Sequence, residues 1–215
     1  MEWVYSILYI FYVLLFIGVF IQVIYYRYQL RSSVYLTKQA IFPMEQAQYE
    51  TIRIAPEWNA MQPFTSTSKR YKWINIITLL ILAFVGFLGY FVFIDQAIQE
   101  QFILVIYLLA SVPGWMKQPG NIYIVKKGVI LHGLFYRWSE VKSYEVEKVV
   151  KWHSLYGYHE KVNNGYLLKV RIKRKWLQPE AVVFSDKKRL DEALSYFHQQ
   201  EIVKKIKEEK KVRNY

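Results

Sequence analysis

The chain has 215 residues, which leaves room for one membrane unit and one small soluble domain. It contains no cysteine, so disulfides, Cys-ligated zinc and thiol catalysis are excluded. The net charge is +12, and from Lys117 onward there are 22 Lys and Arg against 11 Asp and Glu. Nearly all of the positive charge therefore lies in the C-terminal part, where it would attract anionic lipid, nucleic acid or acidic proteins.

The first apolar run, Trp3 to Tyr26, is interrupted only by Ser6 and Gln22. As a helix its 24 residues would extend about 36 Å, enough for a hydrocarbon core of about 30 Å. Met1 and Glu2 precede the run, whereas a secretory signal peptide would begin with basic residues and be shorter. We predict an uncleaved transmembrane helix over residues 1–26.

Two further runs follow, Trp73 to Ile94 and the shorter Phe102 to Met116. The second is long enough to span, and the third, with Pro113 and Gly114, could cross if it is tilted or begins near Ala97, or could be re-entrant. Only seven residues separate them, so residues 73–117 are expected to form a transmembrane hairpin. Ala83, Gly86 and Gly89 recur every third residue; they are either ordinary small residues of an apolar helix or positions of close helix packing, and we expect packing within that hairpin.

The distribution of cations predicts the orientation, because cytoplasmic flanks carry the excess of Lys and Arg. Cations follow the first run, precede the second and follow the third, whereas the connection between the second and third carries Asp95 and Glu100 and no cation. The pattern predicts a multi-pass protein of the cell membrane with an outside N-terminus and a cytoplasmic C-terminal domain. A re-entrant third run would put the basic domain outside and break this pattern. No Asp, Glu, Lys, Arg or His lies inside a run, so nothing indicates a transport path.

The stretch between the first two runs, residues 27–72, is predicted to be a cytoplasmic connecting segment. Met44 to Tyr49 is compatible with a helical turn, and Thr51 to Ala55 alternates like a short strand. Its end, Phe64 to Lys72, is rich in Ser and Thr and is typical of a linker. The segment would either pack on the C-terminal domain or lie among lipid headgroups.

Residues 118–215 change from long apolar runs to short alternating segments, and we predict a cytoplasmic domain of about six or seven antiparallel strands. The predicted strands are 122–126, 129–132, 134–138, 141–150, 165–175 and 181–184, with a tight turn at Lys127-Gly128. A helix capped by Ser185 should follow, with Leu190, Ala193, Leu194 and Phe197 at core spacing. The expected fold class is membrane α-helices plus a C-terminal α+β domain.

One stretch of this domain, Lys127-Gly128-Val129-Ile130-Leu131-His132-Gly133 followed by Trp138-Ser139-Glu140-Val141, resembles the bacterial PH-like domains. Such domains often follow a membrane hairpin in small bacterial membrane proteins. The resemblance covers roughly residues 121–200 and implies an antiparallel β-barrel capped by a C-terminal helix, with no catalytic residues. The first apolar run and the long segment behind it depart from the two-helix version of this architecture.

The most distinctive charged feature lies on the predicted strand 165–175. There Tyr166, Leu168, Val170 and Ile172 share one face and the cations share the other. The predicted site, facing anionic lipid or a partner, consists of Lys169, Arg171, Lys173, Arg174, Lys175 and Trp176. The alternative is a solvated outer face of the sheet that follows the positive-inside bias.

Other chemistries have less support in the sequence. His153 and His159 share one connection with Glu160, but their spacing matches no metal motif, and we expect no metal and no cofactor. No nucleophile-elbow, phosphate-loop or zinc-protease pattern occurs. Aromatics and cations alternate near Lys151-Trp152 and Lys175-Trp176, but no recognised motif supports nucleic-acid binding.

The sequence therefore predicts a non-enzymatic membrane protein that presents a basic PH-like domain at the inner leaflet. The domain would bind anionic lipid headgroups, or an unidentified membrane or cytoplasmic protein, in a scaffold or regulatory role. The alternative is an accessory subunit of a membrane enzyme or transporter whose active residues lie in a partner. A homo-oligomer is compatible with either.

Overall fold

The computed structural model describes residues 2–55, 57–94, 102–115, 120–173 and 180–205. The chain divides into two compact units, each built from two separate stretches of sequence. The helical unit comprises Met1–Ser32 and Phe64–Gln118, and the mixed α/β unit comprises Ser33–Pro63 and Pro119–Tyr215. The segment between the first two apolar runs is thus split between the units.

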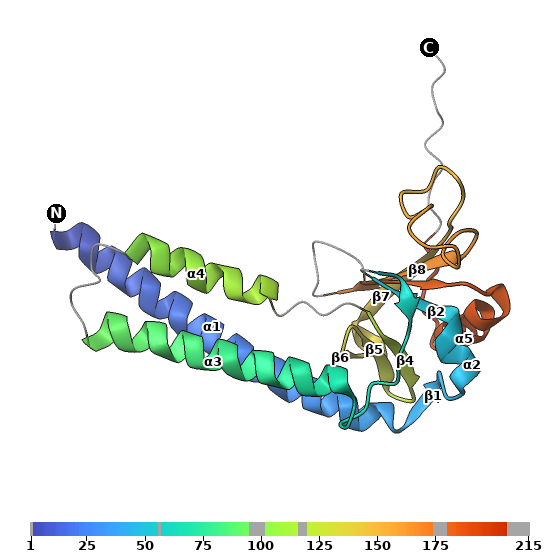
Figure 1. The fold of residues 1–215 in the computed structure, drawn as a ribbon, viewed down its shortest axis with the longest axis horizontal. Helices are drawn as coiled ribbons and strands as arrows, with labels where there is room; N and C mark the ends of the chain where they lie inside the picture. The colour runs from blue at the N-terminus through green and yellow to red at the C-terminus, as the bar shows by residue number, and fades with distance from the viewer. Residues whose placement is uncertain (1, 56, 95–101, 116–119, 174–179, 206–215) are drawn as a thin grey trace, which may run out of the picture. The chain divides into compact units, whose positions relative to one another are not determined.

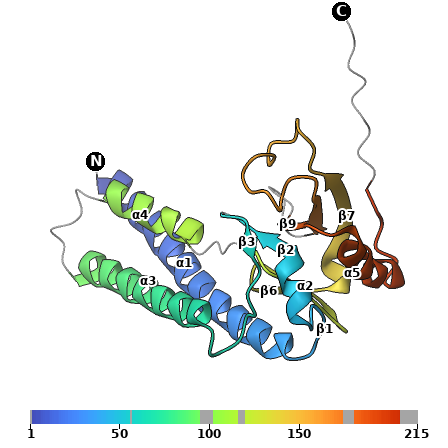
Figure 2. The ribbon, with the colours of Figure 1, turned by 45° about the vertical axis from the view of Figure 1, so that its right-hand side comes forward.

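The helical unit contains helices α1 (Glu2–Thr37), α3 (Lys69–Ile94) and α4 (Phe102–Trp115), which run side by side in Figures 1 and 2. In the described residues, Tyr9–Thr37 of α1 and Lys69–Tyr90 of α3 are long and apolar enough to cross a membrane. Helix α1 continues to Thr37, well past the predicted end of the apolar run at Tyr26. Helix α4 has 14 residues, about 21 Å of helix, which is shorter than a typical span.

Helices α1 and α3 are antiparallel and in direct contact. Near one end the Tyr12 hydroxyl donates to the Leu88 carbonyl oxygen at 3.3 Å. Toward the other end the Arg27 guanidinium donates to Asn75 Oδ1 at 3.0 Å. A Cβ atom at Gly89 would lie 2.8 Å from the Phe16 ring, so Gly89 accommodates a side chain of α1. The expectation that this glycine packs within the α3–α4 hairpin is wrong, because its open side faces α1.

The α/β unit holds two antiparallel sheets. The four-stranded sheet has the order β1-β4-β5-β6, with β1 at Ala40–Phe42, β4 at Ile122–Val125, β5 at Gly128–Leu131 and β6 at Leu134–Arg137. The five-stranded sheet has the order β3-β2-β9-β8-β7, with β3 at Asn59–Ala60, β2 at Ile52–Ile54, β9 at Glu180–Phe184, β8 at Tyr166–Ile172 and β7 at Val141–Lys148. All six strands predicted after residue 120 are confirmed, and the described strands do not close into one barrel.

The chain passes from one sheet to the other at the short helix η2 (Trp138–Glu140), between β6 and β7. Beyond β7, the backbone of residues 203–205 extends the five-stranded sheet. The Tyr144 N–H donates to Val203 O at 3.2 Å, and the Lys205 N–H donates to Tyr144 O at 2.8 Å. This short parallel bridge covers part of the outer edge of β7.

The residues between α1 and α3 are part of the sheets. Strand β1 pairs with β4, and β2 pairs with β9. Phe42 and Ile52 are fully buried. The predicted helical turn is helix α2 (Gln46–Thr51), and the predicted short strand at Thr51 to Ala55 is β2. This segment packs into the C-terminal domain because its short strands supply backbone partners that β4 and β9 would otherwise lack.

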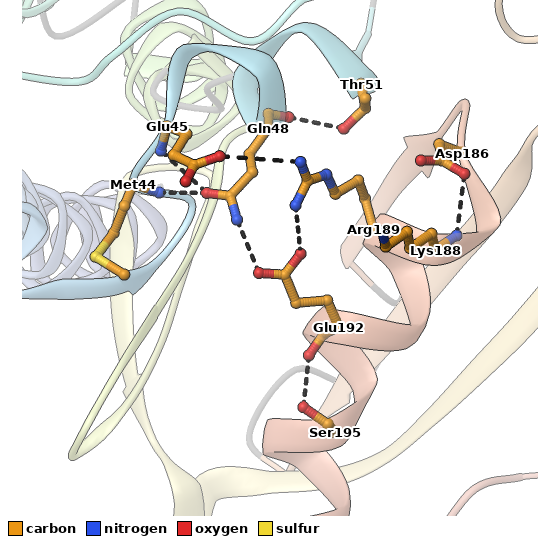
Figure 3. A network of polar contacts seen from close by, with 9 residues as sticks. All are labelled: Met44, Glu45, Gln48, Thr51, Asp186, Lys188, Arg189, Glu192 and Ser195. Atoms are coloured by element: carbon orange, nitrogen blue, oxygen red, sulfur yellow. Dashed lines mark hydrogen bonds and ion pairs between the residues drawn. The ribbon is translucent and has the colours of Figure 1, made fainter.

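A network of hydrogen bonds and ion pairs links helix α2 to helix α5 (Lys187–Gln199), as Figure 3 shows. The Gln48 side chain is buried, and its Nε2 donates to Glu192 Oε1 at 2.8 Å. Its Oε1 accepts from the backbone N–H groups of Met44 and Glu45, at 2.6 and 3.1 Å. Arg189 donates to the second oxygen of Glu192 at 2.9 Å, and its other terminal nitrogen lies 3.9 Å from Glu45 Oε2. This network holds helices α2 and α5, which are far apart in the sequence, against each other.

The predicted core face of α5 is confirmed, because Leu190, Ala193, Leu194 and Phe197 are all buried. The predicted cap is wrong by one residue. Asp186 is the N-cap and accepts from the Lys188 N–H, while both the N–H and the hydroxyl of Ser185 donate to Thr51 O. Ser185 therefore continues the strand pairing, and the cap begins where that pairing ends.

The turn of the β4–β5 hairpin also differs from its prediction. Lys126 and Lys127 form the turn, and Gly128 already belongs to β5, opposite Val125 and Arg137. A Cβ atom on Gly128 would clash with the carbonyl oxygen of Tyr136 on β6. The glycine is therefore required by the close approach of the neighbouring strand, not by the turn.

Candidate interaction surface

Two residues of the predicted basic site, Lys169 and Arg171, lie on the outer face of β8, and the expected alternation along this strand is confirmed. Leu168, Val170 and Ile172 are buried on the inner face, whereas Lys169 and Arg171 point to the other face. Leu167 is also buried, although it lies on the same face as the cations. The outer face of the sheet is therefore apolar near the start of β8 and charged further along it.

Each of these two cations faces a carboxylate of the neighbouring strand β7. Lys169 Nζ donates to Glu147 Oε2 at 2.7 Å, and an Arg171 terminal nitrogen lies 3.8 Å from Glu145 Oε2. In the strand register Lys169 is directly opposite Glu145, and Arg171 is opposite Ser143, so both ion pairs are diagonal. The sequence pattern of β8 could not show this neutralisation, because the carboxylates belong to another strand.

The remaining predicted residues stand apart from these pairs. Lys173 is exposed just after β8, and its backbone N–H donates to Glu140 O at 2.8 Å. Arg174, Lys175 and Trp176 lie outside the described residues. Among the described cations of the predicted site, Lys173 is the one that the structure places away from Glu145 and Glu147.

Glu147 connects the charged part of the surface to the next loop. His153 Nε2 lies 3.3 Å from Glu147 Oε2, the same oxygen that Lys169 contacts. His159 accepts from the Lys161 N–H through Nδ1, and His198 Nε2 lies 2.6 Å from the Tyr144 hydroxyl. Within the part of the chain that the structure describes, no three His, Asp or Glu side chains come together as metal ligands.

A second feature was missed by sequence reasoning. An open depression has a volume of about 490 Å³ and lies between the β4–β5 turn and the junction of β6 with η2. It is lined by Lys127, Phe135, Arg137, Trp138 and Ser139. The Trp138 indole N–H donates to Lys126 O at 3.2 Å, which fixes the ring. Its lining combines two cations with two aromatic rings. Trp138 entered the sequence reasoning only as part of a family-like motif.

Burial shifts the pKa of several groups of this unit, among them Tyr49, whose pKa it raises. Burial raises the pKa of Tyr144, whose ring packs against Phe197 with centroids 5.5 Å apart. Burial lowers the pKa of Arg53, whose guanidinium donates to Glu50 O at 3.0 Å. The Tyr144 hydroxyl also contacts His198 Nε2 at 2.6 Å, and the charge of Glu50 partly offsets the effect of burial on Arg53.

Comparison with protein-family models, with curated proteins and with solved structures finds no match for this chain. The description of the chain therefore rests on its own residues: apolar helices, two antiparallel sheets with a C-terminal helix, and a partly neutralised basic surface.

Proposed function

We propose that this chain is a non-enzymatic integral membrane protein that presents its basic α/β unit to anionic lipid headgroups or to a partner protein at the inner leaflet. The proposal includes three membrane crossings, an outside N-terminus and a cytoplasmic α/β unit. Its support is the occurrence, in one chain, of two apolar helices of spanning length and an α/β unit that carries most of the positive charge.

The proposal also treats the α/β unit as a variant of the bacterial PH-like domains. Antiparallel strands followed by a C-terminal helix support this assignment, and α5 packs its Phe197 ring against Trp138 and Tyr144. The variant would differ by drawing three strands and a helix from the segment before the hairpin. In that reading the domain is a binding module, and its role is scaffolding or regulation.

One observation carries the binding role: two cations of the basic surface are paired with carboxylates, whereas Lys173 lies beyond these pairs. Lys169 and Arg171 are compensated by Glu147 and Glu145, so they contribute little net field. Lys173 is exposed beyond these pairs, and the sequence continues with Arg174 and Lys175. We therefore propose that the attraction for an anionic surface comes from Lys173 and from Arg174 and Lys175, which follow it in the sequence.

The test uses the full chain in phosphatidylcholine nanodiscs, mixed with vesicles that contain phosphatidylglycerol. We expect co-flotation with these vesicles at low salt and its loss at high salt, because the attraction is screened over about 8 Å at physiological ionic strength. Lys173→Gln with Lys175→Gln should weaken the binding. The matched control is Lys187→Gln with Lys188→Gln on α5, which removes the same charge from exposed positions.

Equal loss of binding in both double variants would mean that only the net charge matters, and the assigned surface would be wrong. If the wild-type chain binds vesicles with and without phosphatidylglycerol equally, the lipid role fails. Crosslinking in native membranes through residue 173 then tests the protein-binding role.

A further inference from the structure

The loop between β7 and β8, residues 149–165, is long but its ends are closed. The Val149 N–H donates to Gly165 O at 2.8 Å, and the Asn164 N–H donates to Val149 O at 2.9 Å. A compact loop whose ends meet in this way is an Ω-loop, a type that is frequently functional. We refer to residues 149–165 as the Ω-loop. In Figures 1 and 2 it projects beyond the ends of the two strands that it joins.

The inner side of the Ω-loop has an apolar core of its own. Val149 and Val162 are fully buried against Leu167, Val183 and Trp58, on the outer face of the five-stranded sheet. Leu155 and Tyr156 pack against the same cluster. Within the loop the Gly157 N–H donates to Asn163 Oδ1 at 2.8 Å. The loop thus has one preformed shape, with its smaller apolar side chains turned toward the sheet.

Its two other aromatic side chains are turned the opposite way. Trp152 is 88% exposed and Tyr158 is 69% exposed. Lys151 and Lys161, within the loop, and Lys148, at the end of β7, are also exposed. An exposed tryptophan does not gain the free energy of burying a large apolar ring, although the same loop fully buries Val149 and Val162. An ordered loop with exposed aromatics and flanking cations has the composition of an element that meets an interface.

We propose that the Ω-loop docks on a lipid surface, with Trp152 and Tyr158 entering the headgroup region and the three lysines facing anionic headgroups. Tryptophan and tyrosine are the residues enriched at membrane–water interfaces, because one part of each ring system is apolar and the other is polar. Three exposed lysines against one exposed carboxylate, Glu160, leave a positive charge that complements anionic lipid. The apolar helices of the same chain favour a lipid surface over a soluble partner, because they hold the loop at high effective concentration near a bilayer.

This proposal rests on the proposed membrane insertion of the chain, but it does not depend on the surface proposed for residues 173–175. The chain contains no cysteine, so Ser154→Cys, an exposed position between the two aromatics, gives a single site for a spin label. The full chain is reconstituted in vesicles of phosphatidylcholine and phosphatidylglycerol. Collision with oxygen, which concentrates in lipid, is compared with collision with a water-soluble nickel chelate. The matched control is a label at Lys187→Cys, exposed on α5.

We expect the label at residue 154 to favour oxygen and the label at residue 187 to favour the nickel chelate. Adding Trp152→Ser should return the label at residue 154 to an aqueous signature, and adding Lys173→Gln with Lys175→Gln should leave its depth unchanged. Trp152 is almost fully exposed, so its replacement leaves the fold intact. A label at residue 154 that behaves like the control overturns the proposal. Shielding from both reagents also overturns it, because that signature indicates a protein partner or a second copy of the chain.

Discussion

Gln48 and Glu192 are 144 positions apart in the sequence, yet the Gln48 side-chain amide donates to the Glu192 carboxylate at 2.8 Å. Gln48 lies in the segment before the α3–α4 hairpin, and Glu192 lies on the C-terminal helix. The Gln48 amide is buried and serves two further backbone N–H groups. The contact therefore joins the two parts of the α/β unit, which α3 and α4 separate in the sequence.

Replacing this amide should destabilise the α/β unit. Gln48→Ala leaves the N–H groups of Met44 and Glu45 without their acceptor and removes the donor to Glu192. We expect a loss of about 1–3 kcal/mol in the free energy of unfolding. Urea titration of the full chain in detergent, read by protease sensitivity of the α/β unit, measures it. The control Lys188→Ala, exposed on the same helix, should change stability by less than about 0.5 kcal/mol. Equal effects of the two changes would contradict the assigned role.

The α3–α4 hairpin should be removable without loss of the α/β fold. The Ile122 N–H donates to the Met61 sulfur at 3.4 Å, so the chain leaves and re-enters this unit at neighbouring points. A fusion of residues 33–63 to residues 119–215 through a short Gly-Ser linker should therefore fold in water. Circular dichroism should show mixed strand and helix, and amide NMR signals should be dispersed.

Residues 119–215 alone should behave differently. Without residues 33–63, β4 loses β1, β9 loses β2, and the fully buried Phe42 and Ile52 are missing. Open strand edges and lost core volume should make this fragment unstable or aggregated. Equal stability of the fragment and the fusion would show that the earlier segment is dispensable.

Stability of the α/β unit should fall at alkaline pH. Burial raises the pKa of Tyr144 from its ordinary value of 10.0. Below pH about 10 the phenol is protonated in both states; above it the unfolded chain loses the proton while the folded chain keeps it. The free energy of unfolding therefore decreases as the pH rises above about 10. Urea midpoints of the 33–63/119–215 fusion between pH 8 and 11 measure this slope.

The variant Tyr144→Phe isolates the contribution of this group. It loses the 2.6 Å contact with His198 and should be less stable at pH 8 by about 0.5–1.5 kcal/mol. Its alkaline decline should be shallower than that of the wild type, because one of the shifted phenols is gone. The lysines titrate alike in both proteins and cancel in the comparison. Parallel pH profiles would show that Tyr144 does not contribute.

The proposed orientation predicts which tags can be reached in intact cells. A reporter fused after Tyr215 should be cytoplasmic, and an epitope inserted within residues 95–101 should be labelled from outside. The reason is the cation distribution: Lys69, Arg70 and Lys72 lie in the first turn of α3, whereas the 95–101 connection carries no cation. Labelling of the epitope only after the membrane is opened would contradict three crossings with this orientation.

Local pattern was sufficient for the elements whose neighbours in sequence are also their neighbours in space. The alternation of Leu168, Val170 and Ile172 predicted β8 and its buried face, because side chains of a strand point alternately to opposite sides. The spacing of Leu190, Leu194 and Phe197 predicted the buried face of α5 in the same way. The length of the apolar runs identified α1 and α3.

Tertiary structure decided everything that depends on a remote partner. Period-two alternation tells which residues share a face but not which strand lies beside them, so the pairing of Lys169 with Glu147 and of Arg171 with Glu145 could not be predicted. The alternation at Thr51 to Ala55 indicated β2 but not its neighbour β9, and Ala40–Phe42 is too short to specify a strand, so β1 forms because β4 offers open backbone groups. The sequence could not predict the exposure of Trp152 either. An aromatic side chain in a loop can turn toward the sheet, as Tyr156 does, or toward water.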